Sequence, residues 1–482
     1  MKKINKIIKI TFVVLAILFI VPSVIYLIQN KTVFGFNNYY NFFINDGSNK
    51  ILSSILYLVI FLAMTAIYIV FIKKKDIFKN IKELLIYTGI ASSIFILMLP
   101  WTTSDIFYYM GVGELDSVYG QNPYYVTMHK YYEENKENIQ DEILEQGANN
   151  FWADTVVVYG PIAQLIFKIL TAISFKNINV CIILFKLFNI AIHILNCYLI
   201  YKMTKNLKFV IIYGLNPFIL LEFFGQVHND ITIVLFVLLS LYFLKEKKKL
   251  IPSLIFLAIA TGIKYFTILL LPVILLYYFR DEEKLLKKFM KCVGYGLLFL
   301  AMFGAEYILY FKDISVMTSM GAQTQRYCKS LYSGLYSIGF INKDINQLLD
   351  WNKLRIDAHW VVFVIFVLIY EAFCIKLLVT KKNDLEKSIQ GYNDMLILFM
   401  MSLSNFQQWY LIWFFATIIW QKRGMMKDII VVTTASEIAN SVYMFKIESW
   451  RYDYIFVLTI IFIYIIWKLW SKILFKENSC KI

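Results

Sequence analysis

Apolar segments alternate with short polar connections along almost the whole chain. An α-helix needs about 20 apolar residues to cross a bilayer, and somewhat fewer where it is short and surrounded by other helices. The pattern predicts an all-α, polytopic integral membrane protein with roughly 12 to 14 transmembrane helices. The candidate spans are residues 8–28, 51–72, 84–100, 159–175, 179–201, 209–224, 229–244, 251–279, 290–310, 359–380, 392–405, 409–421, 428–445 and 453–470.

The amino-acid composition agrees with this class. Of the 482 residues, 59% are hydrophobic and only 17% are charged, whereas soluble domains carry about 25% charged residues. No polar segment is long enough for a separate soluble domain. The six cysteines show no CxxC spacing and the four histidines show no metal-binding spacing. We therefore expect neither a zinc site nor a cofactor.

The net charge of +15 comes largely from lysines in short connections between the spans. Basic residues gather at 73–75, 245–249, 381–382 and 422–423, and they also precede the first span. Positive charge in short loops marks the cytoplasmic side of a membrane protein, so both termini are expected there. No small-residue cleavage site follows the first span, which favours an uncleaved anchor. The lysines thus indicate topology, and we expect a bilayer but no nucleic acid as partner.

This orientation makes residues 101–158 and 311–358 two long loops on the outer face. One inconsistency remains, because simple crossings cannot place the lysines near position 205 and those at 245–249 on the same side. One of the three segments before them must be re-entrant or lie at the interface. The segments are 159–175, 179–201 and 209–224.

Residues 251–279 form one overlong apolar segment whose flanking charges both require the cytoplasm. Two short helices that meet near residues 261–264 satisfy this requirement, with Gly262 at the break. Lys264 then lies at the outer end of the pair. It either faces a cavity or an anionic partner, or it extends its ammonium group to the interface.

A first group of polar residues follows the 84–100 span. Residues 104–119 fit an amphipathic surface helix that carries Asp105, Tyr109 and Asp116 on one face and turns Glu114 away. A carboxylate at the membrane surface can activate a hydroxyl group. Asp105 also has a simpler explanation, because a Ser-Asp pair is a common helix N-terminus.

A second polar group separates two apolar helices and contains Glu222, His228, Asn229 and Asp230. The last three are expected at the outer surface, level with Asp105. Polar groups of this density beside membrane spans are usually functional, although a satisfied polar turn is an alternative.

Three further positions are candidates for substrate binding. Tyr159 closes the first outer loop, and aromatic faces pack well on sugar rings. Arg326 lies in the second outer loop, and its planar guanidinium suits a phosphate. Gln408 belongs to a polar and aromatic turn that faces out.

The order of these motifs resembles that of the GT-C membrane glycosyltransferases, and within them the bacterial polyprenol-phosphate-mannose-dependent mannosyltransferases. The resemblance covers residues 84–280, with one outlying match later in the chain. In chain order the motifs are Ser104-Asp105, Gln121-Asn122-Pro123-Tyr124, Tyr159-Gly160-Pro161, Leu215-Asn216-Pro217 with Glu222, His228-Asn229-Asp230, Ile263-Lys264-Tyr265 and Gln408-Trp409-Tyr410.

The resemblance implies that Asp105 is the catalytic base, since the family places an acidic base in the first outer loop. It also implies that a basic group near the outer face, such as Lys264, binds the carrier phosphate. Bacterial relatives often have a Trp-Asp-Gly-Arg run after the first Asp, where this chain has Gly111-Val112-Gly113-Glu114. This departure leaves the sugar and the acceptor open, but not the reaction class.

The expected activity is therefore an inverting transfer of a hexose, most simply mannose, from a polyprenyl-phosphate-linked donor. The acceptor would be a cell-envelope glycan or glycolipid on the outer face of the cell membrane. We expect residues 1–360 to form the catalytic membrane module and residues 361–482 to add C-terminal transmembrane helices. A transporter or flippase for lipid-linked saccharides is the alternative, although no internal repeat supports it.

Overall fold

The computed structural model describes residues 2–30, 47–74, 76–100, 102–317, 326–446 and 450–479. Within these ranges the chain is helical, and its only β-pairing is an isolated bridge between Cys328 and Asn405. Buried apolar side chains from Phe12 to Ile429 form one continuous core. The predicted all-α class is confirmed.

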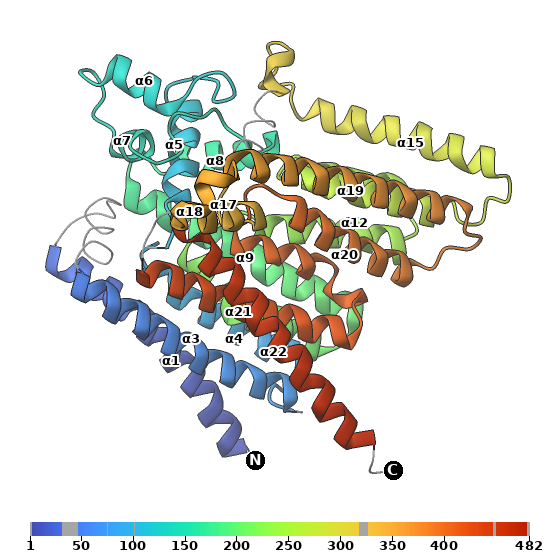
Figure 1. Cartoon of the computed structure of the whole chain (residues 1–482), viewed down its shortest axis with the longest axis horizontal. Coiled ribbons are helices and arrows are strands. Elements are labelled where there is room, and N and C mark those ends of the chain that lie inside the picture. Colours follow the sequence, from blue (N-terminus) through green and yellow to red (C-terminus); the bar gives the residue numbers. More distant parts are fainter. Residues whose placement is uncertain are drawn as a thin grey trace.

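The helices follow one another closely along the chain (Figure 1). The first half contains α1 (Lys2–Asn30), α3 (Gly47–Lys73), α4 (Ile81–Ile94), η2 (Phe95–Leu97), α5 (Asp105–Ser117), α6 (Met128–Asn135), α7 (Glu142–Ala148), α8 (Pro161–Ala172), α9 (Ile178–Thr204), α10 (Leu207–Gly214), α11 (Pro217–Leu220), η3 (Leu221–Gly225) and α12 (Ile231–Lys245). The second half contains α13 (Leu250–Thr261), η4 (Tyr265–Leu270), α14 (Leu271–Tyr278), α15 (Leu285–Ala305), η5 (Ile314–Met317), α17 (Leu331–Ile341), α18 (Lys343–Leu348), α19 (Trp351–Val379), α20 (Leu385–Ser402), η7 (Gln408–Trp420), α21 (Arg423–Lys446), η8 (Trp450–Tyr452) and α22 (Asp453–Ser479).

Six of the described helices, α1, α3, α9, α15, α19 and α22, are long and apolar enough to cross a membrane. A seventh span is possible if the bent pair formed by α10 and α11–η3 is one crossing. Shorter apolar helices accompany them, including α8, α12, α13 and η7. Every apolar segment predicted from the sequence overlaps a helix, so the protein is a multi-pass membrane protein.

The two predicted irregularities are present. Residues 251–279 form α13 and, after a break at 262–264, η4 and α14. The break packs directly on the start of α8, since the Gly262 carbonyl accepts hydrogen bonds from the backbone amides of Ile162 and Ala163. The segment at 207–225 is the irregular one, with a bend of 47°.

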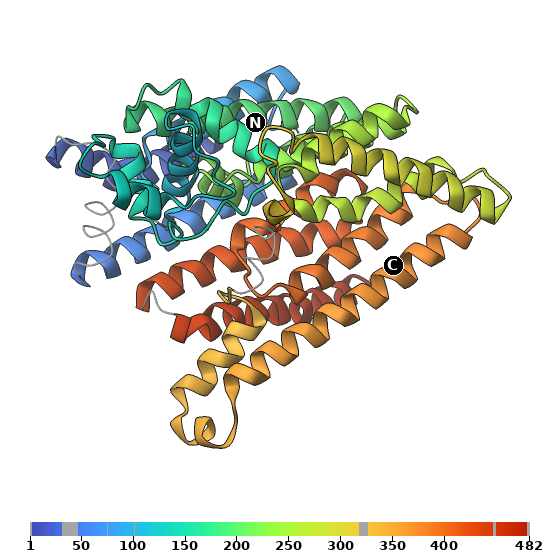
Figure 2. The ribbon, with the colours of Figure 1, turned by 90° about the horizontal axis from the view of Figure 1, so that it is seen from above.

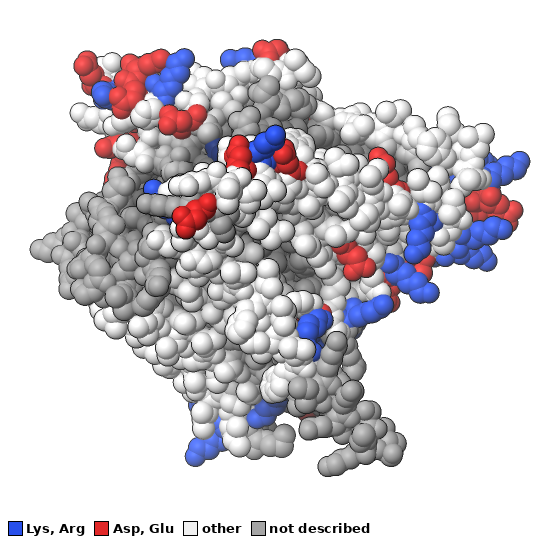
Figure 3. Space-filling view, viewed as in Figure 1, with Lys and Arg blue, Asp and Glu red and all other residues white. Residues whose placement is uncertain are grey.

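Charged side chains lie at opposite ends of the helices. Lys and Arg gather where α12 and α19 end and α15 begins, and α1 begins and α22 ends at the lower edge of the same view (Figures 1 and 3). The lysines at 245–249 and 381–382 are exposed there. Helices α5, α6 and α7 lie at the other end. The basic connections and helices α5, α6 and α7 therefore lie at opposite ends of the molecule.

The C-terminal helices pack alongside the earlier ones. Figure 2 shows the orange and red helices as a layer beside the blue and green ones. Helix η7 packs on α12, and α21 packs on α3. Side chains from the two ends of the sequence can therefore meet.

Residues 104–119 do not form a surface helix, so that prediction was wrong. Helix α5 forms there but is buried on all sides. Two glycines explain the difference. A Cβ atom on Gly111 would lie 2.8 Å from the Cα atom of Gly147 in α7, and one on Gly113 would lie 2.7 Å from the carbonyl oxygen of Phe167 in α8. Bare backbone at both positions lets two helices enclose α5.

We predict that Gly113→Ala lowers the thermal unfolding temperature of the detergent-solubilised protein. Overpacking of this kind costs about 1–3 kcal/mol, which exceeds the gain of about 1 kcal/mol that alanine brings to a helix interior. Gly296→Ala in α15 is the control, because its added Cβ meets no atom within 4 Å. Equal or higher melting of Gly113→Ala would contradict the close packing around α5.

Candidate active site

Asp105 begins α5 and lies 13% exposed at the centre of a polar cluster. The Tyr109 hydroxyl, one turn later, donates a hydrogen bond to its Oδ2 atom at 3.3 Å. The Tyr159 hydroxyl donates in turn to the Tyr109 hydroxyl at 3.3 Å. The helical spacing of Asp105 and Tyr109 thus brings them together as the sequence predicts.

His228 connects Asp105 to a second carboxylate. Its Nδ1 atom lies 3.5 Å from Asp105 Oδ2, and its Nε2 atom lies 3.1 Å from Glu222 Oε2. The Trp409 ring stacks on the imidazole with 3.6 Å between ring centroids. Because His228 is completely buried, these contacts fix both the position and the orientation of its ring.

The local backbone is unusual where it presents these groups. Glu222 lies in a single π-helical turn, η3, a form that occurs frequently at functional sites. Val227 has a φ of +66°, which is strained for a β-branched residue. The side-chain amide of Asn189 holds the strained turn by donating to the carbonyl oxygens of Phe223 and His228, at 2.9 and 3.0 Å.

The contacts of His228 determine the charge of both partners. Burial alone would raise the pKa of the Asp105 carboxyl, but His228, Thr103 and Tyr109 hold that pKa below its ordinary value. Burial alone would lower the pKa of His228, but Asp105 and Glu222 raise it. At neutral pH, Asp105 is therefore a carboxylate that is ready to accept a proton.

A second ion pair lies next to this cluster. The Lys264 ammonium group donates to Asp230 Oδ1 at 2.7 Å, and the Trp413 indole donates to the same oxygen at 2.7 Å. Tyr410 and Trp413 are three residues apart in the 3₁₀ helix η7, where side chains at this spacing align. Their rings stack at 4.7 Å, and the ammonium group lies 4.0 Å from the Tyr410 ring. Of the two alternatives for Lys264, the structure shows the anionic partner.

A cavity with about 430 Å³ of empty space opens beside Asp105. Its wall combines the carboxylate, one arginine and several aromatic rings. The Arg326 guanidinium stacks over the Trp152 ring at 3.9 Å, and its Nη2 atom has no hydrogen-bond partner among the described residues. The lining residues are Asp105, Tyr108, Trp152, Val158, Tyr159, Arg326, Asn405, Gln407, Trp409 and Tyr410.

Gln408 does not line the cavity. It contacts the polar cluster through Glu222, on the side away from Asp105. Its side-chain amide donates to Glu222 Oε1 at 3.2 Å. Its Oε1 atom lies 3.5 Å from the Lys329 ammonium group, which also donates to Asn440 at 2.9 Å. Gln408 thus links the buried carboxylate to residues of the C-terminal helices.

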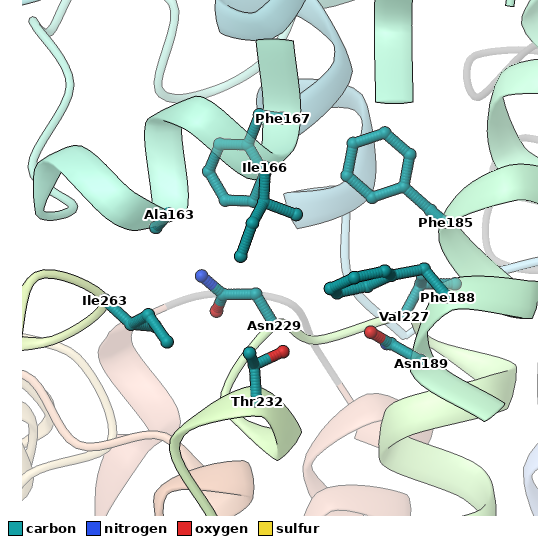
Figure 4. A pocket seen from close by; sticks show the side chains of 10 residues that line it. All are labelled: Ala163, Ile166, Phe167, Phe185, Phe188, Asn189, Val227, Asn229, Thr232 and Ile263. Carbon is teal, nitrogen blue, oxygen red and sulfur yellow. The ribbon is translucent and has the colours of Figure 1, made fainter. Parts of the chain in front are cut away.

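Two predicted site residues lie apart from Asp105. Asp116 occupies the far end of α5, where Lys168, at 2.7 Å, and Tyr310, at 3.0 Å, satisfy its carboxylate. Asn229 lines a separate apolar pocket with about 290 Å³ of empty space (Figure 4). Neither polar atom of the Asn229 amide has a hydrogen-bond partner among the described residues.

Glu114 is turned away from Asp105 and forms a buried contact with Asp141 instead. Burial, the charge of Asp141 and a hydrogen bond to it raise the pKa of Glu114 to about 8, although Lys176 opposes the shift. The pKa of Glu114 in the folded protein lies above the ordinary 4.5. The Glu114 carboxyl group therefore stabilises the folded state least at high pH. Its contribution is complete at acid pH and is lost as the pH rises through about 8.

We therefore predict that Glu114→Gln raises the unfolding temperature relative to the parent protein at about pH 9 but not at about pH 4. Glutamine keeps a hydrogen-bond donor to Asp141 and cannot ionise. The measurement is a pair of melting curves at the two pH values. A difference that did not change with pH would contradict the raised pKa of Glu114.

Sequence reasoning missed several residues of this region. Trp152 and Trp413 were not predicted, because nothing in their spacing distinguishes them from the Trp residues that are common at membrane interfaces. Glu437 did carry a signal, because it is an isolated acidic residue inside the apolar segment 428–445. An ionisable residue within a membrane span is a candidate functional residue by default.

Comparison with known proteins addresses the family directly. The family model described as "Alpha-(1->6)-mannopyranosyltransferase, N-terminal domain" matches residues 14–280, which is more than half of the chain. No match was found among curated proteins or among solved structures. The matched region contains Asp105, Glu222, His228, Asp230 and Lys264. The chain therefore belongs to the alpha-(1->6)-mannopyranosyltransferase family, a GT-C family of membrane mannosyltransferases.

Proposed function

We propose that this mannosyltransferase uses a polyprenyl-phosphate-linked mannose as donor and a cell-envelope glycan or glycolipid as acceptor, with Asp105 as the base. The observation that carries the proposal is the position of Asp105 and Arg326 on the wall of one cavity. A base and a phosphate-binding cation are the two groups that such a transfer requires.

The reaction is a single displacement. The acceptor hydroxyl oxygen attacks the anomeric carbon while its proton passes to Asp105. The bond between that carbon and the phosphate oxygen breaks on the opposite side, so the configuration inverts. The products are the mannosylated acceptor and polyprenyl phosphate. The phosphate is a good leaving group, so only one proton transfer needs side-chain help, which typically contributes about 10²- to 10⁴-fold.

Arg326 is a better candidate for the phosphate than Lys264. Lys264 is already paired with Asp230 and covered by aromatic rings, whereas Arg326 lines the cavity and, among the described residues, has no carboxylate within 4 Å. Its planar fork can hold two phosphate oxygens and offset the charge that develops as the sugar departs. Lys264 then acts by positioning Asp230 and η7.

The aromatic residues of the cavity suit a sugar. Trp152, Tyr159 and Tyr410 line it together with the polar groups, and aromatic rings pack well against the apolar faces of pyranoses. Helix α5, which begins at Asp105 of the cavity wall, lies at the end of the molecule opposite the exposed lysine clusters (Figures 1 and 3). This arrangement supports a site on the outer face with both termini in the cytoplasm.

The proposal is tested with purified protein in detergent, radiolabelled polyprenyl-phosphate-mannose and a crude lipid and glycan extract as acceptor. We expect label on the acceptor, with inverted anomeric configuration of the mannose by NMR. Transfer from a mannose sugar nucleotide but not from the lipid would overturn the proposed donor. Movement of the labelled lipid across proteoliposomes without any transfer would indicate a flippase instead.

A further inference from the structure

The turn between α20 and η7 contributes two amide side chains, Asn405 and Gln407, to the wall of the cavity. The Gln407 Nε2 group donates a hydrogen bond to Asn405 Oδ1 at 3.0 Å. Among the described residues, neither the Asn405 Nδ2 group nor the Gln407 Oε1 atom has a hydrogen-bond partner. One donor group and one acceptor atom are therefore left for a ligand. Both residues lie outside the region that matches the family.

The extended backbone of this turn explains why the two amides face the same way. Successive side chains of an extended segment point to opposite sides, and Gln407 is extended, with φ −127° and ψ 143°. Asn405 and Gln407 are two residues apart, so both reach the cavity. The residues between and after them point elsewhere. Phe406 packs against a phenylalanine of α22, and Gln408 donates to Glu222.

An isolated parallel bridge holds this segment beside Arg326. The Cys328 amide donates to the carbonyl oxygen of Ser404 at 3.4 Å, and the Phe406 amide donates to that of Cys328 at 3.0 Å. Side chains two residues apart on such a segment point to one side, and Arg326 precedes Cys328 by two positions. The guanidinium and the two amides thus line the same cavity.

These three side chains match the two parts of a sugar phosphate. The guanidinium suits the phosphate. An amide suits neutral hydroxyl groups, because it offers a donor and an acceptor without adding charge. Among the described residues that line the cavity, Arg326 is the one cation, so the sugar itself should be uncharged. Because the amides adjoin Arg326, they face the sugar that is joined to the phosphate.

We propose that Asn405 and Gln407 bind two adjacent hydroxyl groups of the transferred hexose and thereby select the sugar. The Asn405 Nδ2 group donates to one hydroxyl oxygen, and the Gln407 Oε1 atom accepts from its neighbour. This inference rests on the proposed function, because it takes a hexose joined to a phosphate as the ligand. A purely structural role is the competing explanation, since the bond between the amides also holds the turn together.

Deoxygenated donors test the inference directly. Equilibrium binding of radiolabelled polyprenyl-phosphate-mannose is measured without acceptor, together with binding of its 2-, 3-, 4- and 6-deoxy analogues. In the parent protein, loss of either of two adjacent hydroxyl groups should raise Kd about tenfold, the value of one net hydrogen bond. Asn405→Leu and Gln407→Met resemble the native side chains in size but lack the amide. Each should bind the mannose donor about tenfold more weakly and become indifferent to one of those hydroxyl groups.

The pattern of Kd values separates recognition from structure. A variant that only loosens the turn weakens all donors by the same factor and keeps the discrimination of the parent protein, which would overturn the proposal. A parent protein that binds the four deoxy donors as tightly as the mannose donor would also overturn it. Gln390→Ala is the control, because it removes an amide near the start of α20, whereas the turn follows the end of that helix. It should bind every donor like the parent protein.

Failure of the proposed function would give a different result. Binding requires no base, so a parent protein that binds the donors selectively but transfers nothing would contradict the role of Asp105 and leave this inference intact. If the parent protein binds a mannose sugar nucleotide in place of the lipid, the four deoxy analogues of that nucleotide provide the same test. Binding of neither donor would overturn both proposals.

Discussion

Asp105→Asn should reduce mannosyl transfer at least about a hundredfold while leaving the protein folded, because the base is lost and the shape of the side chain is kept. The asparagine can still accept a hydrogen bond from Tyr109 and from protonated His228. Its amide cannot take up the proton of the acceptor hydroxyl. The measurement is initial transfer rate at saturating donor and acceptor, with expression and melting temperature recorded in parallel.

Asp116→Asn is the matched control. It makes the same change in the same helix, but Asp116 lies among Lys168 and Tyr310, away from the cavity. We expect this variant to affect stability more than transfer rate. Activity of Asp105→Asn close to that of the parent protein would show that another group takes the proton.

Arg326→Ala should lower kcat/KM by about 10²-fold, an effect typical for loss of one group that stabilises developing charge. The guanidinium is stacked on Trp152 and faces the cavity, so its removal leaves the leaving phosphate without that cation. Arg326→Lys should recover only part of the loss, because an ammonium group cannot form the two parallel hydrogen bonds of the planar fork.

Lys264→Ala distinguishes the two cations. If Lys264 bound the phosphate, its loss would mainly weaken donor binding. We expect it to destabilise the fold, because among the described residues it leaves the buried Asp230 carboxylate with the Trp413 indole as its one side-chain hydrogen-bond donor. Donor saturation curves together with melting temperatures separate these outcomes. A large increase in KM for the donor at unchanged stability would reassign the phosphate to Lys264.

Sequence patterns located the features that depend on local rules. The break at 262–264 followed from charges that required both ends of one apolar segment on the same side. The pairing of Asp105 with Tyr109 followed from helical spacing. The sequence predicted that His228 and Asp105 lie at the same depth in the membrane. It did not predict that the two side chains are in contact, because that depends on how η3 packs against the start of α5.

Features that depend on long-range packing could not be predicted from the sequence. The burial of α5 arises from the approach of α7 and α8 to its glycines, which no periodicity of residues 104–119 reveals. The hydrogen bond from the Tyr57 hydroxyl to Glu437 depends on how α21 lies against α3. Arrangements of this kind are determined by the complete set of helix contacts, so single-segment reasoning cannot recover them.

The separation of the site residues along the chain has a consequence for biosynthesis. Glu222 and Gln408 are hydrogen-bonded partners 186 residues apart. The Trp413 indole, which donates to Asp230, lies 183 residues after it in the chain. During membrane insertion, the ribosome releases the N-terminal carboxylates long before their C-terminal partners exist. A chain that ends before η7 already holds His228 beside Glu222 and Lys264 beside Asp230. It lacks the Gln408 and Trp413 donors and the Trp409 and Tyr410 walls of the cavity, so it should remain inactive until η7 has docked.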